Sequence, residues 1–329
     1  MNNKTIIRNL IENTFKTVFI LLLMIGMACY LGYILAGIPG LIWAGFIIFT
    51  LSIIGPGFSR AILFRLHKIR PIDPFEAPKL YDIVRELSSR AGMDRYPTLY
   101  YLPHNMMRAF TLGTGENAAI GISDGMVRRM NLREIQGVLA HEISHIKHKD
   151  IWTMTFADMV GNFIRLLSFS AQILVIVNIP FILSGDFYIS LISIIIVVLT
   201  PTWVTFLQFA LSRTREYNAD LGAAELTGDP GGLVSALHKL EAEKRRLTLF
   251  HRAWTPGHRS DPPVWLRTHP VTATRIQKLL SFYHHDHLLK RGNHVVHHTG
   301  KKHIPTFFQG PFIRNGNNIT TRHRPLFPY

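Results

Sequence analysis

The sequence predicts a mostly α-helical fold with a small β-sheet, in which a water-exposed domain is combined with four transmembrane helices. Hydrophobic residues make up 47% of the chain and charged residues only 17%, below the roughly 25% of an ordinary soluble domain. Long apolar runs occur in two pairs, and short aromatic and apolar segments bounded by Gly and Pro lie between them. These observations together predict a membrane protein with one compact domain outside the bilayer.

The first pair of apolar runs, residues 17–37 and 38–58, contains no charged residue. Each run has about 21 residues, or roughly 31 Å as a helix, which matches the hydrocarbon core of a bilayer. A Gly-Ile-Pro-Gly break at residues 37–40 joins them, so the pair is predicted to form a transmembrane hairpin. A cleaved signal peptide fits poorly, because the first run is too long and another follows at once.

The second pair comprises residues 163–183, with one charge at Arg165, and residues 187–209. A Ser-Gly-Asp turn at residues 184–186 separates them, and Arg165 lies close enough to one end to reach the lipid headgroups. We predict a second transmembrane hairpin. The alternative is a hairpin buried in protein or lying partly in the membrane interface.

The distribution of basic residues predicts the orientation of these hairpins. Residues 59–157 carry 14 Lys and Arg, the ends of the chain are basic too, and the short turns inside each pair have none. By the positive-inside rule, the N-terminus, residues 59–157 and the C-terminal part are cytoplasmic. The expected location is therefore the plasma (inner) membrane, as a multi-pass protein.

The net charge of +15 and the single cysteine limit the possible partners. A basic excess suits either nucleic acid or a membrane surface, and beside long apolar runs it favours membrane lipids. No nucleic-acid-binding motif is recognisable. Cys29 alone can form neither an intrachain disulfide nor a thiolate cluster, so any metal is expected to be held by His and carboxylate side chains.

Between the hairpins, apolar residues at helical spacing predict a helix over residues 75–91, ended by Gly92. Residues 98–102, 108–112 and 118–122 are apolar or aromatic and predict a small meander of strands.

A further helix is predicted to start at Asn131. This residue can act as N-cap with Glu134 as its reciprocal partner, and the helix should continue to Lys147 or beyond.

That helix contains the sequence His141-Glu142-Ile143-Ser144-His145. Histidines at i and i+4 share one helix face, so both imidazoles can reach one zinc ion, and the Glu between them can act as base toward a water. The motif has few fixed positions, and the alternative is a surface helix with two solvated histidines. The small apolar residues at 137–140 favour a packed helix instead.

Glu216 is the candidate third ligand, because catalytic zinc takes three protein ligands and keeps a fourth position open. Its segment continues the last apolar run and is expected to be helical. Asp220, one turn further on, could accept a hydrogen bond from a zinc-binding His and so fix its tautomer. The alternative is an exposed helix whose charges are simply solvated.

With these motifs in place, residues 15–280 resemble the integral-membrane HtpX-type peptidases, which are relatives of the CAAX prenyl proteases. The resemblance rests on two apolar hairpins and four short motifs, which are Leu139-Ala140-His141-Glu142-Ile143-Ser144-His145, Ser212-Arg213-x-x-Glu216-x-x-Ala219-Asp220, Thr268-His269-Pro270 and Arg275-Ile276. It implies a zincin-like domain that holds one Zn²⁺ through His141, His145 and Glu216, with Glu142 as catalytic base. It also implies cleavage of membrane or unfolded proteins in membrane quality control.

Two further histidines have weaker roles. The resemblance makes His269 a possible donor to the oxyanion of the tetrahedral intermediate, although a histidine before Pro270 can also merely pack. His148 shares the face of His141 and His145, and we expect it to be a neighbour of the metal, because three ligands suffice.

One position departs from the family pattern. Such proteins carry Asn-Ala-Phe in the strand before the helix, whereas this chain has Arg108-Ala109-Phe110. A peptide substrate would add to the edge of this strand. We therefore expect Arg108 to alter substrate preference without abolishing hydrolysis.

Residues 281–329 form a basic tail with eight histidines, which could bind metal loosely or contact anionic lipid, or could be poorly ordered. The predicted organisation is a cytoplasmic N-terminus (1–16), a first hairpin (17–58), catalytic segments (59–157 and 210–280) around a second hairpin (163–209), and this tail.

We expect a zinc metalloendopeptidase that acts on membrane or misfolded proteins at the cytoplasmic side. The alternatives are a CAAX-type processing enzyme for lipidated peptides and a zinc-stabilised scaffold without activity. An intact Glu142 argues against the scaffold, because a structural site needs no base.

Overall fold

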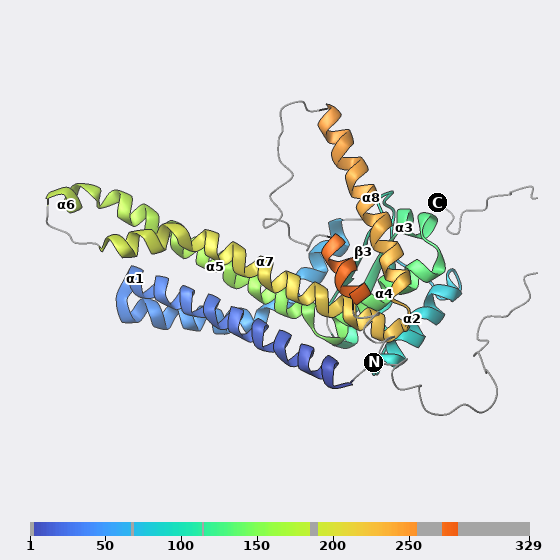
Figure 1. Ribbon diagram of the computed structural model, residues 1–329. Helices are drawn as coiled ribbons and strands as arrows, with labels where there is room; N and C mark the ends of the chain where they lie inside the picture. Colours follow the sequence, from blue (N-terminus) through green and yellow to red (C-terminus); the bar gives the residue numbers. More distant parts are fainter. Residues whose placement is uncertain (1–2, 67–68, 114, 185–189, 255–271, 282–329) are drawn as a thin grey trace, which may run out of the picture.

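The computed structural model describes residues 3–66, 69–113, 115–184, 190–254 and 272–281. A bundle of long helices projects from a smaller domain that contains the sheet (Figure 1). In chain order the elements are α1 Asn3–Leu66, β1 Arg70–Pro71, α2 Pro78–Arg90, β2 Thr98–Leu102, β3 Ala109–Leu112, η1 Gly115–Asn117, β4 Ala119–Ser123, α3 Asp124–Arg129, α4 Leu132–Lys147, α5 Asp150–Val177, α6 Ile179–Ser184, α7 Leu191–Thr227 and α8 Pro230–Trp254; residues 272–281 are also helical. The prediction of a mostly helical chain with a small sheet is confirmed.

The first apolar pair lies within α1, which is not a straight helix. Ala36 and Gly37 have non-helical backbone angles, and Gly37 adopts a φ of +62°, which glycine tolerates best. The chain folds back there, and a Cβ atom added to Gly32 would lie 2.5 Å from the carbonyl oxygen of Gly40. The two halves of α1 therefore run side by side, as Figure 1 shows, with small residues at their contact.

Three helices are long and apolar enough to cross a membrane, namely Glu12–Ile53 in α1, α5 and α7. Most large apolar side chains exposed to the outside belong to these helices, which is the pattern of surfaces that face lipid. The apolar helices are thus confirmed, whereas four membrane crossings stay a prediction. Most of the predicted run 163–183 lies within α5, which begins at Asp150 and ends at Val177, and the rest of the run falls in the short α6 and its flanking residues.

Within the bundle, a side chain on α5 compensates for a proline inside α7. Pro201 has no N–H to donate, so the carbonyl of Val197, four residues earlier, lacks its usual helical partner. The hydroxyl of Ser168 on α5 donates a hydrogen bond of 2.5 Å to that carbonyl oxygen. This bond ties α5 to α7 deep in the apolar part of the bundle.

The sheet contains four strands in the order β1-β2-β4-β3. β2 and β4 are parallel, and β3 pairs antiparallel with β4 at one edge. The predicted meander is therefore wrong in its topology, although the three predicted strands all exist. Every residue of β4 is buried, because helices cover this central strand and β3 flanks it.

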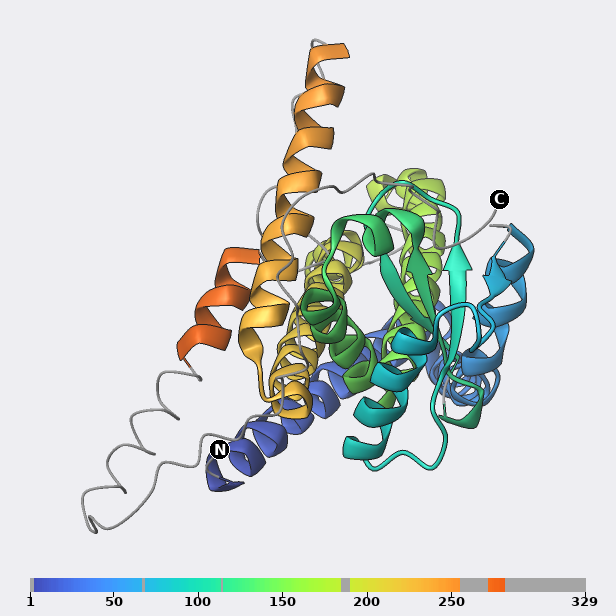
Figure 2. The ribbon, with the colours of Figure 1, turned by 90° about the vertical axis from the view of Figure 1, so that its right-hand side faces the viewer.

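Helix α4, which carries His141, Glu142 and His145, lies between the sheet and the helices α7 and α8 (Figure 2). Its start is the predicted capping box, since Asn131 and Glu134 exchange side-chain-to-backbone hydrogen bonds of 2.9 Å. Lys239 and Ser235 of α8 also bind the carboxylate of Glu134. The N-terminal end of α4 is thereby fixed to α8.

Close packing of α4 on α8 gives a first testable prediction. A Cβ atom at Gly137 would lie 2.6 Å from the backbone nitrogen of Leu233 on α8, so Gly137→Ala must displace one helix. A Cβ atom added to Gly26 in α1 would have no neighbouring atom within 4 Å. Helix propensity favours Ala by about 1 kcal/mol at both sites. We expect Gly137→Ala to be about 1–3 kcal/mol less stable than the Gly26→Ala control, through overpacking.

Thermal unfolding of the detergent-solubilised variants measures this difference. Equal stability of the two alanine variants would show that α4 and α8 are not packed as closely as described.

Candidate metal centre and active site

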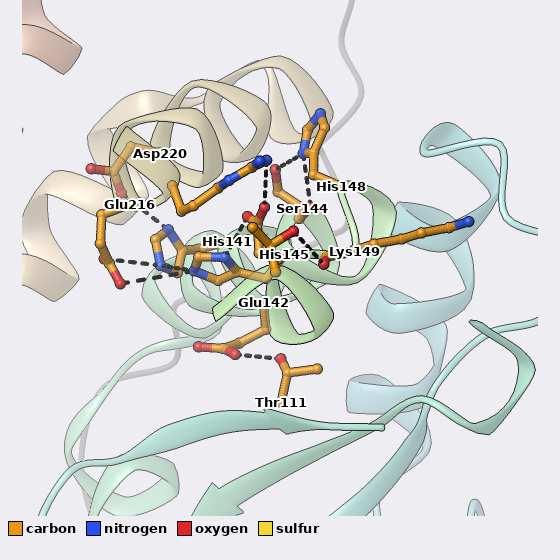
Figure 3. A network of polar contacts seen from close by, with 12 residues as sticks. Thr111, His141, Glu142, Ser144, His145, His148, Lys149, Glu216 and Asp220 are labelled. Carbon is orange, nitrogen blue, oxygen red and sulfur yellow. Dashed lines mark hydrogen bonds and ion pairs between the residues drawn. The ribbon is translucent and has the colours of Figure 1, made fainter. Parts of the chain in front are cut away.

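Three potential metal ligands converge from two helices (Figure 3). His141 and His145 lie one turn apart on α4, and their Nε2 atoms are 3.1 Å apart. Glu216 of α7 is buried beside them, with one carboxylate oxygen 3.6 Å from Nε2 of His141 and the other 4.0 Å from Nε2 of His145. One ligand atom from each residue lies within 4.8 Å of the others, so the three could hold a metal ion.

The separation of the two imidazole nitrogens suits a small tetrahedral ion, and the carboxylate oxygens lie slightly further out. Ligand atoms about 2.0–2.1 Å from zinc lie about 3.3 Å from one another in a tetrahedron. Two nitrogens and one carboxylate oxygen also form a ligand set found in catalytic zinc sites. The structure thus brings together the three residues that the sequence suggested.

The outer nitrogens of both imidazoles face carboxylates. Nδ1 of His145 forms a 2.8 Å hydrogen bond with Asp150, and Nδ1 of His141 lies 3.0 Å from Asp220 in an ion-pair contact that is bent away from hydrogen-bond geometry. Carboxylates in these positions favour the tautomer that leaves Nε2 free as a ligand. Asp220 lies next to His141, so its hydrogen bond to this imidazole stays a prediction, and Asp150 was not predicted.

The position of Asp150 depends on a sharp turn after α4. Lys149 has a φ of +54°, a left-handed conformation that is unfavourable for a residue with a side chain. This turn lets α5 begin at once and directs Asp150, its first residue, back toward the face of α4 that carries His141 and His145. Asp150 also forms an ion pair with Arg215, the neighbour of Glu216, with 3.0 Å between Oδ1 and Nη1. Its carboxylate therefore links α4, α5 and α7.

Arg275 compensates the charge on the other side of the cluster. It comes from the helical residues 272–281, donates two hydrogen bonds of 2.6 and 2.8 Å to Asp220, and lies 3.1 Å from Glu216. Burial lowers the pKa of this guanidinium, but its ion pairs with the two carboxylates outweigh burial and raise it. The sequence offered only the Arg275-Ile276 motif as a signal for this role.

The charges around the ligands do not balance without a cation. Four carboxylates surround the two imidazoles, and two guanidinium groups pair with them; the six residues are Glu142, Asp150, Glu216, Asp220, Arg215 and Arg275. Among these six residues the carboxylates outnumber the guanidinium groups by two, which favours a divalent cation at this place. Burial lowers the pKa of His145, but Asp150, Glu142 and Glu216 together raise it above its ordinary value. A proton on His145 would compete with a metal, so metal affinity should fall in acid.

Glu142 lies beside the three potential ligands, on the side of α4 that faces the sheet (Figure 3). Its side chain is largely buried, and one oxygen accepts a 2.5 Å hydrogen bond from the hydroxyl of Thr111 on β3. The carboxylate is thus held between α4 and the edge strand β3. Thr111 had not been predicted as a site residue.

The remaining predicted residues lie elsewhere. His148 follows α4, and its Nδ1 contacts the carbonyl oxygen of Ser144 at 2.9 Å, outside the three-ligand cluster. Arg108 is exposed just before β3, and its backbone is bonded to Ser123. His269 and the histidine-rich tail fall outside the described residues, so their roles stay predictions.

The contact between Asp150 and His145 gives a second prediction. Asp150→Asn keeps the size of the side chain but removes the charge that orients and polarises the imidazole, and we expect zinc affinity to fall about 10–100-fold. Asp158→Asn, two turns along the same helix and bonded instead to Gln208, should leave affinity unchanged. Competition titration against a chromophoric chelator measures both constants. Equal affinities in the two variants would mean that Asp150 does not act through His145.

Comparisons with known proteins identify the family of this chain. The sequence pattern described as Peptidase family M48 matches residues 74–282. "Protease HtpX homolog" of Campylobacter concisus (strain 13826) is 32% identical, covering 80% of this chain and 95% of its own length. The protein of the same name from Acaryochloris marina (strain MBIC 11017) is 34% identical, with coverages of 82% and 94%.

A crystal structure of S. mikatae Ste24p matches with a TM-score of 0.46 and 20% identity, over 83% of this chain and 67% of that one. This similarity is too low to define the fold. The matched segment contains both helices that carry the ligand cluster, and the relatives match over most of their length. The chain therefore belongs to peptidase family M48, among the HtpX-type membrane proteases.

Proposed function

We propose that this protein is a membrane-anchored zinc metalloendopeptidase that hydrolyses peptide bonds of membrane or misfolded proteins on the cytoplasmic side, as part of membrane protein quality control. The observation that carries the proposal is the convergence of His141, His145 and Glu216 beside the carboxylate of Glu142. A structural metal site needs ligands only, whereas this site adds a buried carboxylate that can accept a proton.

Zinc is the metal that this donor set suits best. Two imidazole nitrogens and one carboxylate leave a fourth position open, and the negative charge around them favours a divalent cation. When bound there, Zn²⁺ would polarise the scissile carbonyl and lower the pKa of the attacking water. His141, His145 and Glu216 would hold it, and Asp150 and Asp220 would orient the two imidazoles.

Glu142 would act as the general base and then as the general acid. It takes a proton from the attacking water, and the same carboxyl group delivers that proton to the leaving amine nitrogen. Its place between α4 and β3 suits this transfer, because the substrate must lie between the metal ligands and the sheet.

The edge strand β3 offers a surface for the substrate backbone. β3 pairs with β4 on one side only. In an antiparallel pair, the backbone N–H and C=O groups of every second residue point away from the partner strand. Arg108 bonds to Ser123 of β4, so the backbone groups of Ala109 and Thr111 face the open edge. A peptide could add there as a further strand, recognised mainly through its backbone. Such recognition suits an enzyme that cleaves unfolded segments of varied sequence.

The location of the site suits substrates at a membrane surface. α5 begins at Asp150 beside the metal ligands, and α7 carries Glu216 only a few turns beyond its apolar part. The ligand cluster therefore lies where the apolar bundle joins the domain (Figure 1). The 14 Lys and Arg of residues 59–157 support a cytoplasmic placement of this domain.

The two alternatives have less support. No contact among the described residues favours a lipidated peptide, and the Ste24p structure is too dissimilar to carry that reading. A scaffold without activity would have no use for a proton acceptor next to its metal ligands.

A third prediction separates catalysis from metal binding. Glu142→Gln keeps the size of the side chain and its contact with Thr111 but removes the base, so we expect hydrolysis of casein to fall by at least about 10²–10⁴-fold. Zinc content and thermal stability should match those of the wild type. Glu86→Gln, on the exposed face of α2, is the matched control and should retain full activity.

Digestion of casein by purified, zinc-loaded protein, followed by mass spectrometry of the fragments, provides the measurement. If wild type and Glu142→Gln bind zinc and both leave casein intact, or both cleave it equally, the proposed function is wrong.

A further inference from the structure

We propose that Thr111 is a positioning residue that holds the base Glu142 in place for proton transfer. Within the described part of the chain, Thr111 is the one side chain that hydrogen-bonds Glu142, at 2.5 Å from its Oε2 (Figure 3). The proposal rests on the proposed function and deepens it, because it assigns a new residue to the same reaction.

The backbone around Thr111 fixes the hydroxyl. β3 is joined to β4 in register, with Thr111 opposite Ile120, and β4 is buried along its whole length. A Thr side chain has a restricted χ1 because it is branched at Cβ. Leu112 is buried on the side of the sheet opposite Thr111, which fixes the alternation of side chains along β3. The hydroxyl therefore has little freedom to leave Glu142.

The hydrogen bond makes the two carboxylate oxygens of Glu142 inequivalent. Thr111 donates to Oε2, so Oε1 keeps all of its acceptor sites and is the oxygen better placed to accept a proton from water. Without the donor, the side chain of Glu142 could rotate, and the productive rotamer would be populated for less of the time. A bond of this kind, from a neutral donor to a charged acceptor, is stronger than one between neutral groups.

Thr111 also connects the base to the substrate surface. Its backbone N–H and C=O face the open edge of β3, while its side chain points to α4. One residue would thus contact the backbone of a bound peptide and the group that transfers its proton. Positioning of this kind affects the rate of the chemical step more than it affects substrate binding.

The test removes the hydroxyl and then restores it. Thr111→Val has nearly the same shape without the donor, and Thr111→Ser keeps the donor without the methyl group. We expect Thr111→Val to lower kcat about tenfold with KM within about twofold, and Thr111→Ser to retain most of the wild-type kcat. Thr98→Val, at an exposed position at the start of β2, is the matched control and should behave as wild type.

A second measurement tests the contact without catalysis. In thermal unfolding of the metal-free protein, Thr111→Val should lower the midpoint in the wild-type background and lower it less in a Glu142→Ala background, because the partner is already missing there. Thr111→Ala replaces Thr111→Val in both measurements if the valine variant does not fold.

The outcomes separate this proposal from the proposed function. An inactive, zinc-loaded wild type would contradict the proposed function, and the unfolding cycle would still decide whether Thr111 holds Glu142. An active wild type with unchanged kcat in Thr111→Val overturns the role of Thr111 alone. Equal losses in Thr111→Ser and Thr111→Val also overturn it, because the methyl group would then matter rather than the hydroxyl.

Discussion

Four acidic side chains meet two imidazoles at the junction of α4, α5 and α7. The packing of the surrounding helices is what brings these buried charges together and pairs them. Each buried carboxylate would be costly without a partner. Arg215 lies against Asp150, and Arg275 lies against Asp220 and Glu216. The remaining excess of negative charge matches the charge of a divalent cation. Helices that are far apart in the sequence must therefore pack together for the site to exist, and the helical residues 272–281 have a part in it through Arg275.

The membrane bundle and the catalytic domain share their helices. α5 and α7 are each continuous from the ligand cluster into the apolar bundle, and α1 packs against both. Near its N-terminal end, Asn13 of α1 also hydrogen-bonds Asn218, two residues from Glu216. A site built on the ends of membrane helices has a fixed depth relative to the bilayer. In the proposed function, this placement would restrict cleavage to substrates at a membrane surface.

Local sequence patterns predicted the parts of the site that depend on helix periodicity. The capping box at Asn131 and the spacing of His141 and His145 are properties of one helix, and Glu216 follows from the continuation of α7. Asp150 was missed because its orientation depends on the left-handed turn at Lys149, which no residue type there announces. Thr111 was missed because its contact joins a strand to a helix.

The errors in the fold have similar causes. The order of the strands could not be read from three short apolar segments. β2 pairs in parallel with β4, although β3 comes between them in the sequence and lies at the edge of the sheet. The part of α5 before residue 163 was not predicted as a helix, because its first turns carry polar residues such as Asp150 and Asp158 and form no apolar run. Both features depend on contacts between distant segments.

X-ray absorption spectroscopy at the zinc edge of the purified full-length protein tests the metal centre most directly. The proposed function predicts one zinc per chain with nitrogen and oxygen ligands at about 2.0–2.1 Å, two of them imidazoles from the cluster described, and no sulfur. Glu216→Ala should lose one oxygen ligand or lose the metal, whereas the Glu86→Gln control should give the wild-type spectrum. A spectrum that lacks two imidazole contributions, or that is unchanged in Glu216→Ala, would contradict the assignment of this cluster as the catalytic zinc site.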